Sequence, residues 1–340
     1  MVSLEAIRES NARVATDLPP GLVAVFVGAT SGIGEAALRH VVEQAVRPRI
    51  YFLGRREIEG KRIEAELKTL NPKGEYHYLK CDASLLKNID TACRYIKERE
   101  QAINLLFLTS GTLLSTLETE EGLHYPAALM YYGRTRFIVN LLPQLRQAPA
   151  LRRVVTVAAG GKEGLISTND FQARNINILS FRGHMTSMIT LSLESLAKQA
   201  PEVSFIHTYP GFVKTNLARE LTGVLSVIVK VVTAPLMALF HIPIEETGER
   251  HTFFATSACF PPRDSERRDA DGISLGNGVV IAAGADGKTG SGVYSIDYAA
   301  EGTAERVQKI IKDYMQDGTA EKVWAHTEEE YMRITGSLAV

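Results

Sequence analysis

A short glycine-rich stretch constrains the fold of this chain more than any other feature. Residues 28–34, Gly-Ala-Thr-Ser-Gly-Ile-Gly, follow an apolar run that predicts a buried strand and precede residues 35–42, which predict a helix. Glycines at this spacing allow a tight turn, a close approach of the backbone to a pyrophosphate, and close packing of helix on strand. The helix N-terminus offers unpaired N–H groups to the phosphate. The predicted dinucleotide contacts in this turn are Gly28, Thr30, Ser31, Gly32, Ile33 and Gly34.

Composition limits the class of protein. With 340 residues, 45% of them hydrophobic, the chain can bury a large core, and we expect a single α/β domain. The net charge of −1 provides no basic field for nucleic acid. The three cysteines show neither metal-ligand nor redox-motif spacing, and residues 1–17 are too polar for a secretory signal. We therefore predict no metal site, a reducing compartment and a cytoplasmic location.

The end of the second predicted strand indicates which dinucleotide is bound. Residues 49–54 are apolar enough for a strand, and Arg55 follows it, 21 positions after Gly34. An acidic residue there binds the ribose 2′-hydroxyl of NAD, whereas an arginine accommodates the 2′-phosphate of NADP. Arg55 therefore favours NADP(H). The alternative is a solvated basic turn that Glu57 and Glu59 partly neutralise.

Strands and helices alternate along the first half of the chain. A helix at 58–70, a strand at 75–79, a helix at 89–100 and a strand at 103–108 predict βαβ units. Asp82 follows the third strand, where it can cap the next helix or contact the adenine. We predict a Rossmann-type, doubly wound α/β fold with a seven-stranded, mostly parallel sheet.

Three segments in this order resemble motifs of the short-chain dehydrogenase/reductase superfamily, from about Leu22 to Thr215. The stretch at 28–34 resembles the TGxxxGIG turn, with Val27 in place of threonine. Residues 110–111 resemble the end of the NNAG segment, and residues 209–215 resemble the PG-x-V-x-T segment. The resemblance implies further cofactor contacts, at Ser110, Gly111, Pro210, Val213 and Thr215.

The catalytic tetrad of that family is missing. The resemblance aligns its asparagine with Met130, its serine pair with Ala158-Ala159, its tyrosine with Arg182 and its lysine with Thr186. Several fungal secondary-metabolite proteins are similar, with a Tyr-Tyr-Gly-Arg helix and a Pro-Gly-Phe-Val segment but no tetrad. The carbonyl reduction typical of the family needs a positioned acid, so other groups must supply the proton or the chemistry differs.

Three residues are candidate replacements, each with a plainer alternative. Tyr131 flanks the asparagine position and could lean into the cleft, although such tyrosines more often pack. Glu163 lies just past the fifth strand, where a solvated loop residue is the alternative. Arg182, at the tyrosine position, could hold an anionic or enolic oxygen. We expect His207 to be a core histidine.

Beyond Thr215 the chain becomes apolar. Residues 221–240 carry only Lys230 and Pro235 as interruptions, which favours an apolar lid for a bulky substrate over membrane contact. We divide the domain into an N-terminal extension (1–20), a dinucleotide-binding core (21–215), a substrate lid (216–260), and a last part with a surface loop, strand and terminal helices (261–340).

The predicted function is an NADP(H)-dependent oxidoreductase that acts on a bulky apolar, secondary-metabolite-type small molecule with non-standard catalytic residues. One alternative is a non-redox dehydratase, isomerase or cyclase on the same scaffold. A second is a catalytically inactive nucleotide-binding protein. The resemblance also suggests a homodimer through the helices that hold Gly133 and Thr186.

Overall fold

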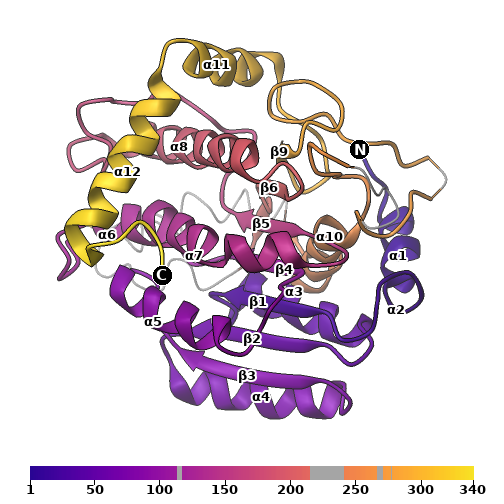
Figure 1. Cartoon of the computed structure of the whole chain (residues 1–340). Helices are drawn as coiled ribbons and strands as arrows, with labels where there is room; N and C mark the ends of the chain where they lie inside the picture. The colour runs from indigo at the N-terminus through magenta and orange to yellow at the C-terminus, as the bar shows by residue number, and fades with distance from the viewer. Residues whose placement is uncertain (113–116, 215–240, 266–270, 277) are drawn as a thin grey trace.

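A seven-stranded sheet forms the centre of the computed structural model, which describes residues 1–112, 117–214, 241–265, 271–276 and 278–340 (Figure 1). Its strands are β1 (Val23–Val27), β2 (Arg49–Gly54), β3 (Glu75–Lys80), β4 (Leu105–Leu108), β5 (Arg153–Val157), β6 (Ser204–Thr208) and β9 (Val293–Ile296). They lie in the order β3-β2-β1-β4-β5-β6-β9, and every neighbouring pair is parallel. The predicted Rossmann-type fold is confirmed.

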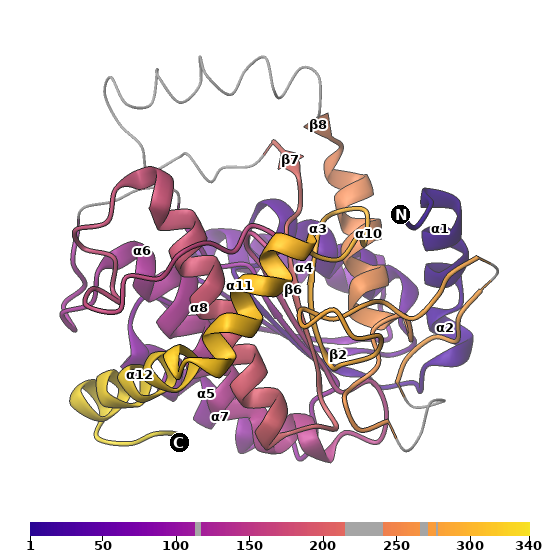
Figure 2. The ribbon, with the colours of Figure 1, turned by 90° about the horizontal axis from the view of Figure 1, so that it is seen from above.

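Helices cover both faces of the sheet (Figures 1 and 2). One face carries α1 (Leu4–Ala12), α3 (Gly32–Gln44), α4 (Glu57–Leu70) and α10 (Ile244–Thr256). The other carries α5 (Leu86–Lys97), α7 (Gly133–Gln147) and α8 (Ile178–Gln199), with α11 (Glu305–Gln316) and α12 (Thr319–Thr335) packed against them. The shorter segments are α2 (Val14–Asp17), α6 (Tyr125–Ala127), a π-helical turn (Ala128–Tyr132), β7 (Phe212–Val213) and β8 (His241–Ile242).

The two-sided burial of the sheet explains its apolar strands. Val25 and Val27 of β1 belong to the core under α5, α7 and α8, whereas Ala24 and Phe26 belong to the core under α3 and α10. Successive strand residues point to opposite faces, so a strand covered on both sides must be apolar throughout. The site therefore rests on a sheet whose strands β1, β4, β5, β6 and β9 are buried throughout.

The chain order changes direction between β1 and β4. From β1 the chain proceeds outward through β2 and β3, then returns to β4 on the other side of β1. In open α/β sheets, ligands bind outside the carboxyl ends of the strands at such a switch point. The glycine-rich turn after β1 and residues 109–111 after β4 meet there.

The described part of the predicted lid differs from the expectation. Residues 215–240 lie outside the described residues, so the apolar run itself cannot be placed. Residues 244–256 form α10, which packs on α3 and α1 and buries Phe253 and Phe254. This segment belongs to the layer that covers the sheet rather than to a lid.

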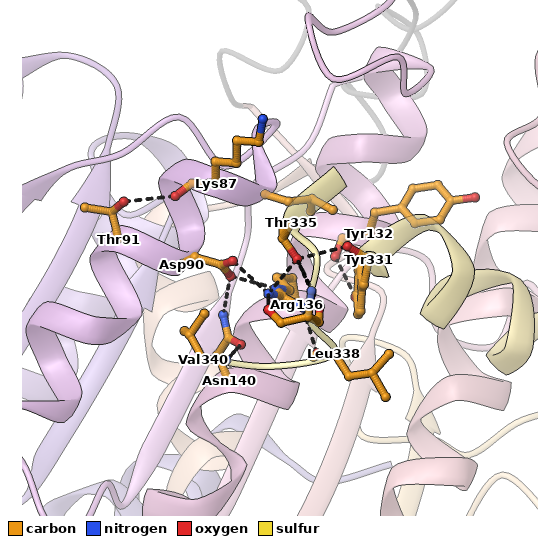
Figure 3. A network of polar contacts seen from close by, with 12 residues as sticks. Lys87, Asp90, Thr91, Tyr132, Arg136, Asn140, Tyr331, Thr335, Leu338 and Val340 are labelled. Carbon is orange, nitrogen blue, oxygen red and sulfur yellow. Dashed lines mark hydrogen bonds and ion pairs between the residues drawn. The ribbon is translucent and has the colours of Figure 1, made fainter. Parts of the chain in front are cut away.

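A buried ion pair joins the C-terminus to the helical layer (Figure 3). The Arg136 guanidinium of α7 donates to both carboxylate oxygens of Asp90 on α5, at 2.6 and 2.7 Å, and both side chains are buried. The same guanidinium donates to the Ser337 and Leu338 carbonyls at 3.0 and 2.7 Å. Asn140 accepts from the Val340 N–H at 3.1 Å.

The packing of α12 limits the surface that the predicted homodimer could use. Of the two helices named for the dimer, α8 is covered in part by α12 of the same chain, and α7 contacts α12 through Arg136 (Figure 2). A homodimer on this face would have to use the surface that α12 leaves uncovered.

No described helix is long and apolar enough to cross a membrane.

Candidate active site

The turn after β1 packs directly against the end of β4. Gly28 has a φ of +82°, and a Cβ atom there would lie 2.7 Å from the Ser110 nitrogen. A Cβ on Gly34 would overlap Thr109 Oγ1 and lie 2.7 Å from the Gly28 carbonyl oxygen. The Thr109 hydroxyl donates to the Val27 carbonyl at 2.9 Å. The glycines are therefore required by close backbone approach at the switch point.

The start of α3 suits a phosphate group. Its first residue, Gly32, has a φ of +61°, which favours glycine. Ser31 precedes the helix in extended conformation, and its side chain does not cap it. Among the described residues, no side chain accepts from the first N–H groups of α3, which directly follow the glycine turn. The Thr30 side chain fills the space next to Gly54, and Ile33 is half-buried.

Arg55 and Asp82 lie beyond the ends of β2 and β3. Arg55 is exposed, and its guanidinium donates to the Tyr125 hydroxyl at 2.6 Å. One Asp82 oxygen accepts from the Ser84 N–H and hydroxyl at 3.0 and 2.7 Å, which closes the turn before α5. The helix-capping role predicted for Asp82 belongs instead to Glu121, which accepts from the first N–H groups of α5.

A buried arginine, which sequence reasoning missed, joins the ends of β4 and β5. The Arg134 guanidinium donates to the Ser110 carbonyl at 3.0 Å, the Thr156 hydroxyl at 2.7 Å and the Val157 carbonyl at 2.8 Å. Burial lowers its pKa to about 9, and no carboxylate of the described residues pairs with it. Its only sequence signal is its place in the Tyr-Tyr-Gly-Arg segment. It fixes Ser110, next to Gly111, in the floor of the site.

Tyr131 is a packing residue in this structure. Its side chain is fully buried, and its hydroxyl lies 2.7 Å from Ser192 Oγ and 2.6 Å from Thr327 Oγ1. Burial raises its pKa to about 12. The hydroxyl points to α8 and α12, so the cleft-facing position that would make it catalytic is not observed.

We expect Tyr131→Phe to lower the free energy of unfolding by about 1–3 kcal/mol, because Ser192 and Thr327 would lose a buried partner. Urea unfolding measures this change, and NADPH titration of the same variant should show unchanged affinity. Tyr95→Phe is the control, since the Tyr95 hydroxyl has no hydrogen-bond partner among the described residues. A loss of NADPH binding without a loss of stability would contradict the packing role.

Glu163 is neither a solvated loop residue nor exposed to a substrate. Its side chain is 1% exposed, and Oε1 accepts from the Thr190 hydroxyl at 2.8 Å and the Ser295 hydroxyl at 2.5 Å. Burial raises the pKa of its carboxyl group, and Oε2 has no partner among the described residues. Both sequence interpretations assumed an exposed position, and both are corrected here.

His207 completes this buried network. Its Nδ1 lies 2.9 Å from Thr190 Oγ1, and its Nε2 accepts from the Ala159 N–H at 3.3 Å. Burial lowers its pKa to about 3, so it stays neutral at physiological pH. The expected core histidine is confirmed, and the network holds the loop after β5 from the inside.

Arg182 is the one predicted catalytic candidate that is exposed at this edge. It lies on α8, with its guanidinium carbon 5.1 Å from the centre of the Tyr209 ring. Lys162, after β5, has its ammonium group 5.7 Å from the same ring. Sequence reasoning gave Lys162 no role and named Tyr209 only as the first residue of the 209–215 segment, because neither stands at a tetrad position.

The segment after β6 continues into β7. Pro210 is half-buried, Gly211 has a φ of +78°, and Val213 pairs with Ile242 of β8. Thr215 lies outside the described residues. The described part of this predicted cofactor-contacting segment therefore stands at the same edge of the sheet as the glycine turn.

Comparison with known proteins gives the family. A family model described as short chain dehydrogenase matches residues 22–159. Oxidoreductase AN1596 of Emericella nidulans is 39% identical over 332 residues, covering 96% of this chain and 97% of that protein. Oxidoreductase andH of Emericella variicolor is 38% identical over 341 residues, covering 99% of each chain.

The chain belongs to the short-chain dehydrogenase/reductase superfamily. The relatives' names agree with the predicted oxidoreductase class. Among solved structures, an alcohol dehydrogenase from the archaeon Thermococcus sibiricus, complexed with 5-hydroxy-NADP, has a TM-score of 0.53 at 17% identity, covering 75% of this chain and 94% of that one. This likeness concerns the fold.

Proposed function

We propose that this chain is an NADP(H)-dependent oxidoreductase that acts on a bulky, apolar, secondary-metabolite-type molecule. The observation that carries the proposal is the cradle formed by Gly28, Gly32 and Gly34, in which a Cβ atom on Gly28 or Gly34 would collide with the end of β4. The uncapped start of α3 adds N–H donors for a pyrophosphate. Relatives named as oxidoreductases support the same assignment.

Each group of residues has a separate task in this proposal. When bound, the nicotinamide supplies or accepts a hydride. The glycine turn holds the pyrophosphate, and Arg55 neutralises the 2′-phosphate. Arg134 fixes Ser110 at the end of β4, and residues 210–213 after β6 would help to hold the nicotinamide. The apolar run at 221–240 supports a bulky apolar substrate on sequence grounds alone.

We expect Arg55→Ala to weaken NADPH binding about tenfold and to leave NADH binding nearly unchanged, because only NADPH carries the 2′-phosphate. The measurement is fluorescence titration of both cofactors. Arg56→Ala is a matched control, since Arg56 is also exposed and pairs with Glu59 at 3.3 Å. Equal weakening of both cofactors would count against the role of Arg55.

A non-redox reaction is the second candidate, and the missing tetrad favours it. Arg182, Thr186 and Ala159 cannot reproduce a tyrosine, lysine and serine constellation, so a dehydratase, isomerase or cyclase on this scaffold is the rival. NADPH deuterated at C4, incubated with bulky apolar ketones and enones, separates the two. Deuterium in a product supports the oxidoreductase. Conversion that continues without cofactor supports the rival.

A further inference from the structure

Two cations flank one aromatic ring at the carboxyl edge of the sheet. Lys162 follows β5, Arg182 lies on α8, and Tyr209 follows β6. The ring of Tyr209 has the guanidinium carbon 5.1 Å and the ammonium nitrogen 5.7 Å from its centre. Both distances are within the range of a cation–π interaction. Tyr209 directly precedes the Pro210–Val213 segment, so this group borders the proposed substrate site.

A backbone contact holds the two cations near each other. The Gly164 N–H donates to the Gly183 carbonyl at 3.1 Å, and a Cβ on either glycine would lie 3.0 Å from the Cα of the other. The Ser187 hydroxyl donates to the Gly164 carbonyl at 2.7 Å. Gly183 is next to Arg182, and Gly164 is two residues after Lys162. The loop after β5 is thus fixed on α8, and the cations need little ordering to act together.

The two cations at this edge have no acidic partner in the part of the chain that the structure describes. Within the described ranges, neither Lys162 nor Arg182 has a carboxylate within ion-pair distance. The adjacent Glu163 is buried and directed to Ser295 and Thr190. Arg134, beneath the same edge, is also without a carboxylate partner among the described residues. As far as the described residues go, the two exposed cations therefore keep their donors available to a ligand.

We propose that Lys162 and Arg182 bind an anionic oxygen of the substrate beside the Tyr209 ring, so that the substrate is an apolar molecule that carries a carboxylate or an enolate. This inference rests on the proposed function, which puts the substrate at this edge. A guanidinium and an ammonium group both donate charge-assisted hydrogen bonds to such an oxygen. The half-buried ring supplies an apolar surface for the adjoining skeleton.

The test is made on the intact chain with two fluorescent probes that share one aromatic skeleton. 1-Anilinonaphthalene-8-sulfonate is anionic, and N-phenyl-1-naphthylamine lacks the sulfonate. We expect Lys162→Gln and Arg182→Gln each to weaken binding of the anionic probe about tenfold and to leave the neutral probe unchanged. Arg182→Lys should restore most of the affinity. Arg94→Gln, which removes an exposed cation from α5, should change neither probe.

Displacement of the anionic probe separates carboxylate from enolate. Displacement by 2-naphthoate at neutral pH supports a carboxylate, whereas displacement by 2-acetyl-1-tetralone that strengthens as pH rises supports an enolate. Methyl 2-naphthoate is the neutral control. Equal displacement by the ester and the acid, or unchanged binding of the anionic probe to both glutamine variants, would overturn the proposal.

NADPH titration of the same variants tests the proposed function separately. We expect native affinity, because the cradle at Gly28–Gly34 is remote in sequence from both cations and contacts β4 instead. If both variants lost NADPH affinity and kept the anionic probe, the cations would belong to the cofactor and this inference would be wrong. Native NADPH binding with a lost anionic probe supports both proposals.

Discussion

Gly34→Ala is expected to weaken NADPH binding at least about a hundredfold, or about 2.8 kcal/mol. The added methyl group would overlap Thr109 Oγ1 and approach the Gly28 carbonyl oxygen to 2.7 Å. The Gly28 carbonyl is backbone, so relief requires α3 to move away from β1 and β4. Such a shift displaces the N–H groups that the proposed function assigns to the pyrophosphate.

Fluorescence titration with NADPH checks this expectation, with circular dichroism and a melting curve on the same sample. Gly276→Ala is the matched control, because a Cβ there meets nothing within 4 Å. We expect the control to bind as the native chain does. Native affinity in a folded Gly34→Ala variant would show that the cradle does not hold the cofactor.

The largest expected effect on stability is that of Asp90→Ala. The Asp90 carboxylate accepts from two Arg136 nitrogens and from Asn140 Nδ2 at 2.8 Å, all in a buried setting. Removing it leaves the guanidinium buried without its counter-ion, which costs about 3–5 kcal/mol. We expect a large shift of the urea unfolding midpoint, together with loosening of the C-terminal residues that Arg136 holds.

A matched control for this variant is Asp313→Ala on α11. Asp313 pairs with Lys309 at 2.7 Å, but both side chains are exposed, and such a pair contributes about 0–1 kcal/mol. If the Asp90→Ala and Asp313→Ala variants had the same urea unfolding midpoint, the view that the buried cluster anchors the C-terminus would be contradicted. Limited proteolysis gives a second readout, since the Asp90 variant should lose C-terminal residues first.

Much of the fold could be predicted from the sequence because its signals are local. The apolar run before Gly28 and the glycine spacing after it define β1, the turn and α3 without reference to the rest of the chain. Strand and helix alternation then predicts the parallel sheet. The sequence pattern predicts the last helix at 328–334, whereas α12 begins at Thr319, nine positions earlier.

The candidate site was harder to predict because its side chains meet across long sequence distances. Glu163 seemed exposed after a strand, yet its partners Thr190 and Ser295 come from α8 and β9. Tyr131 meets Thr327, 196 residues later. Lys162 belongs to no motif, and Tyr209 only begins the 209–215 segment, so their proximity follows only from the place where β5, β6 and α8 converge. No local pattern reports such a convergence.

Equilibrium titration of the purified native chain with NADPH and with NADH tests most directly whether the chain binds NADP(H) in preference to NAD(H). We expect one NADPH per chain, with a dissociation constant in the micromolar range, and binding of NADH at least about tenfold weaker. The absence of binding by either dinucleotide, or equal binding of the two, would contradict this expectation.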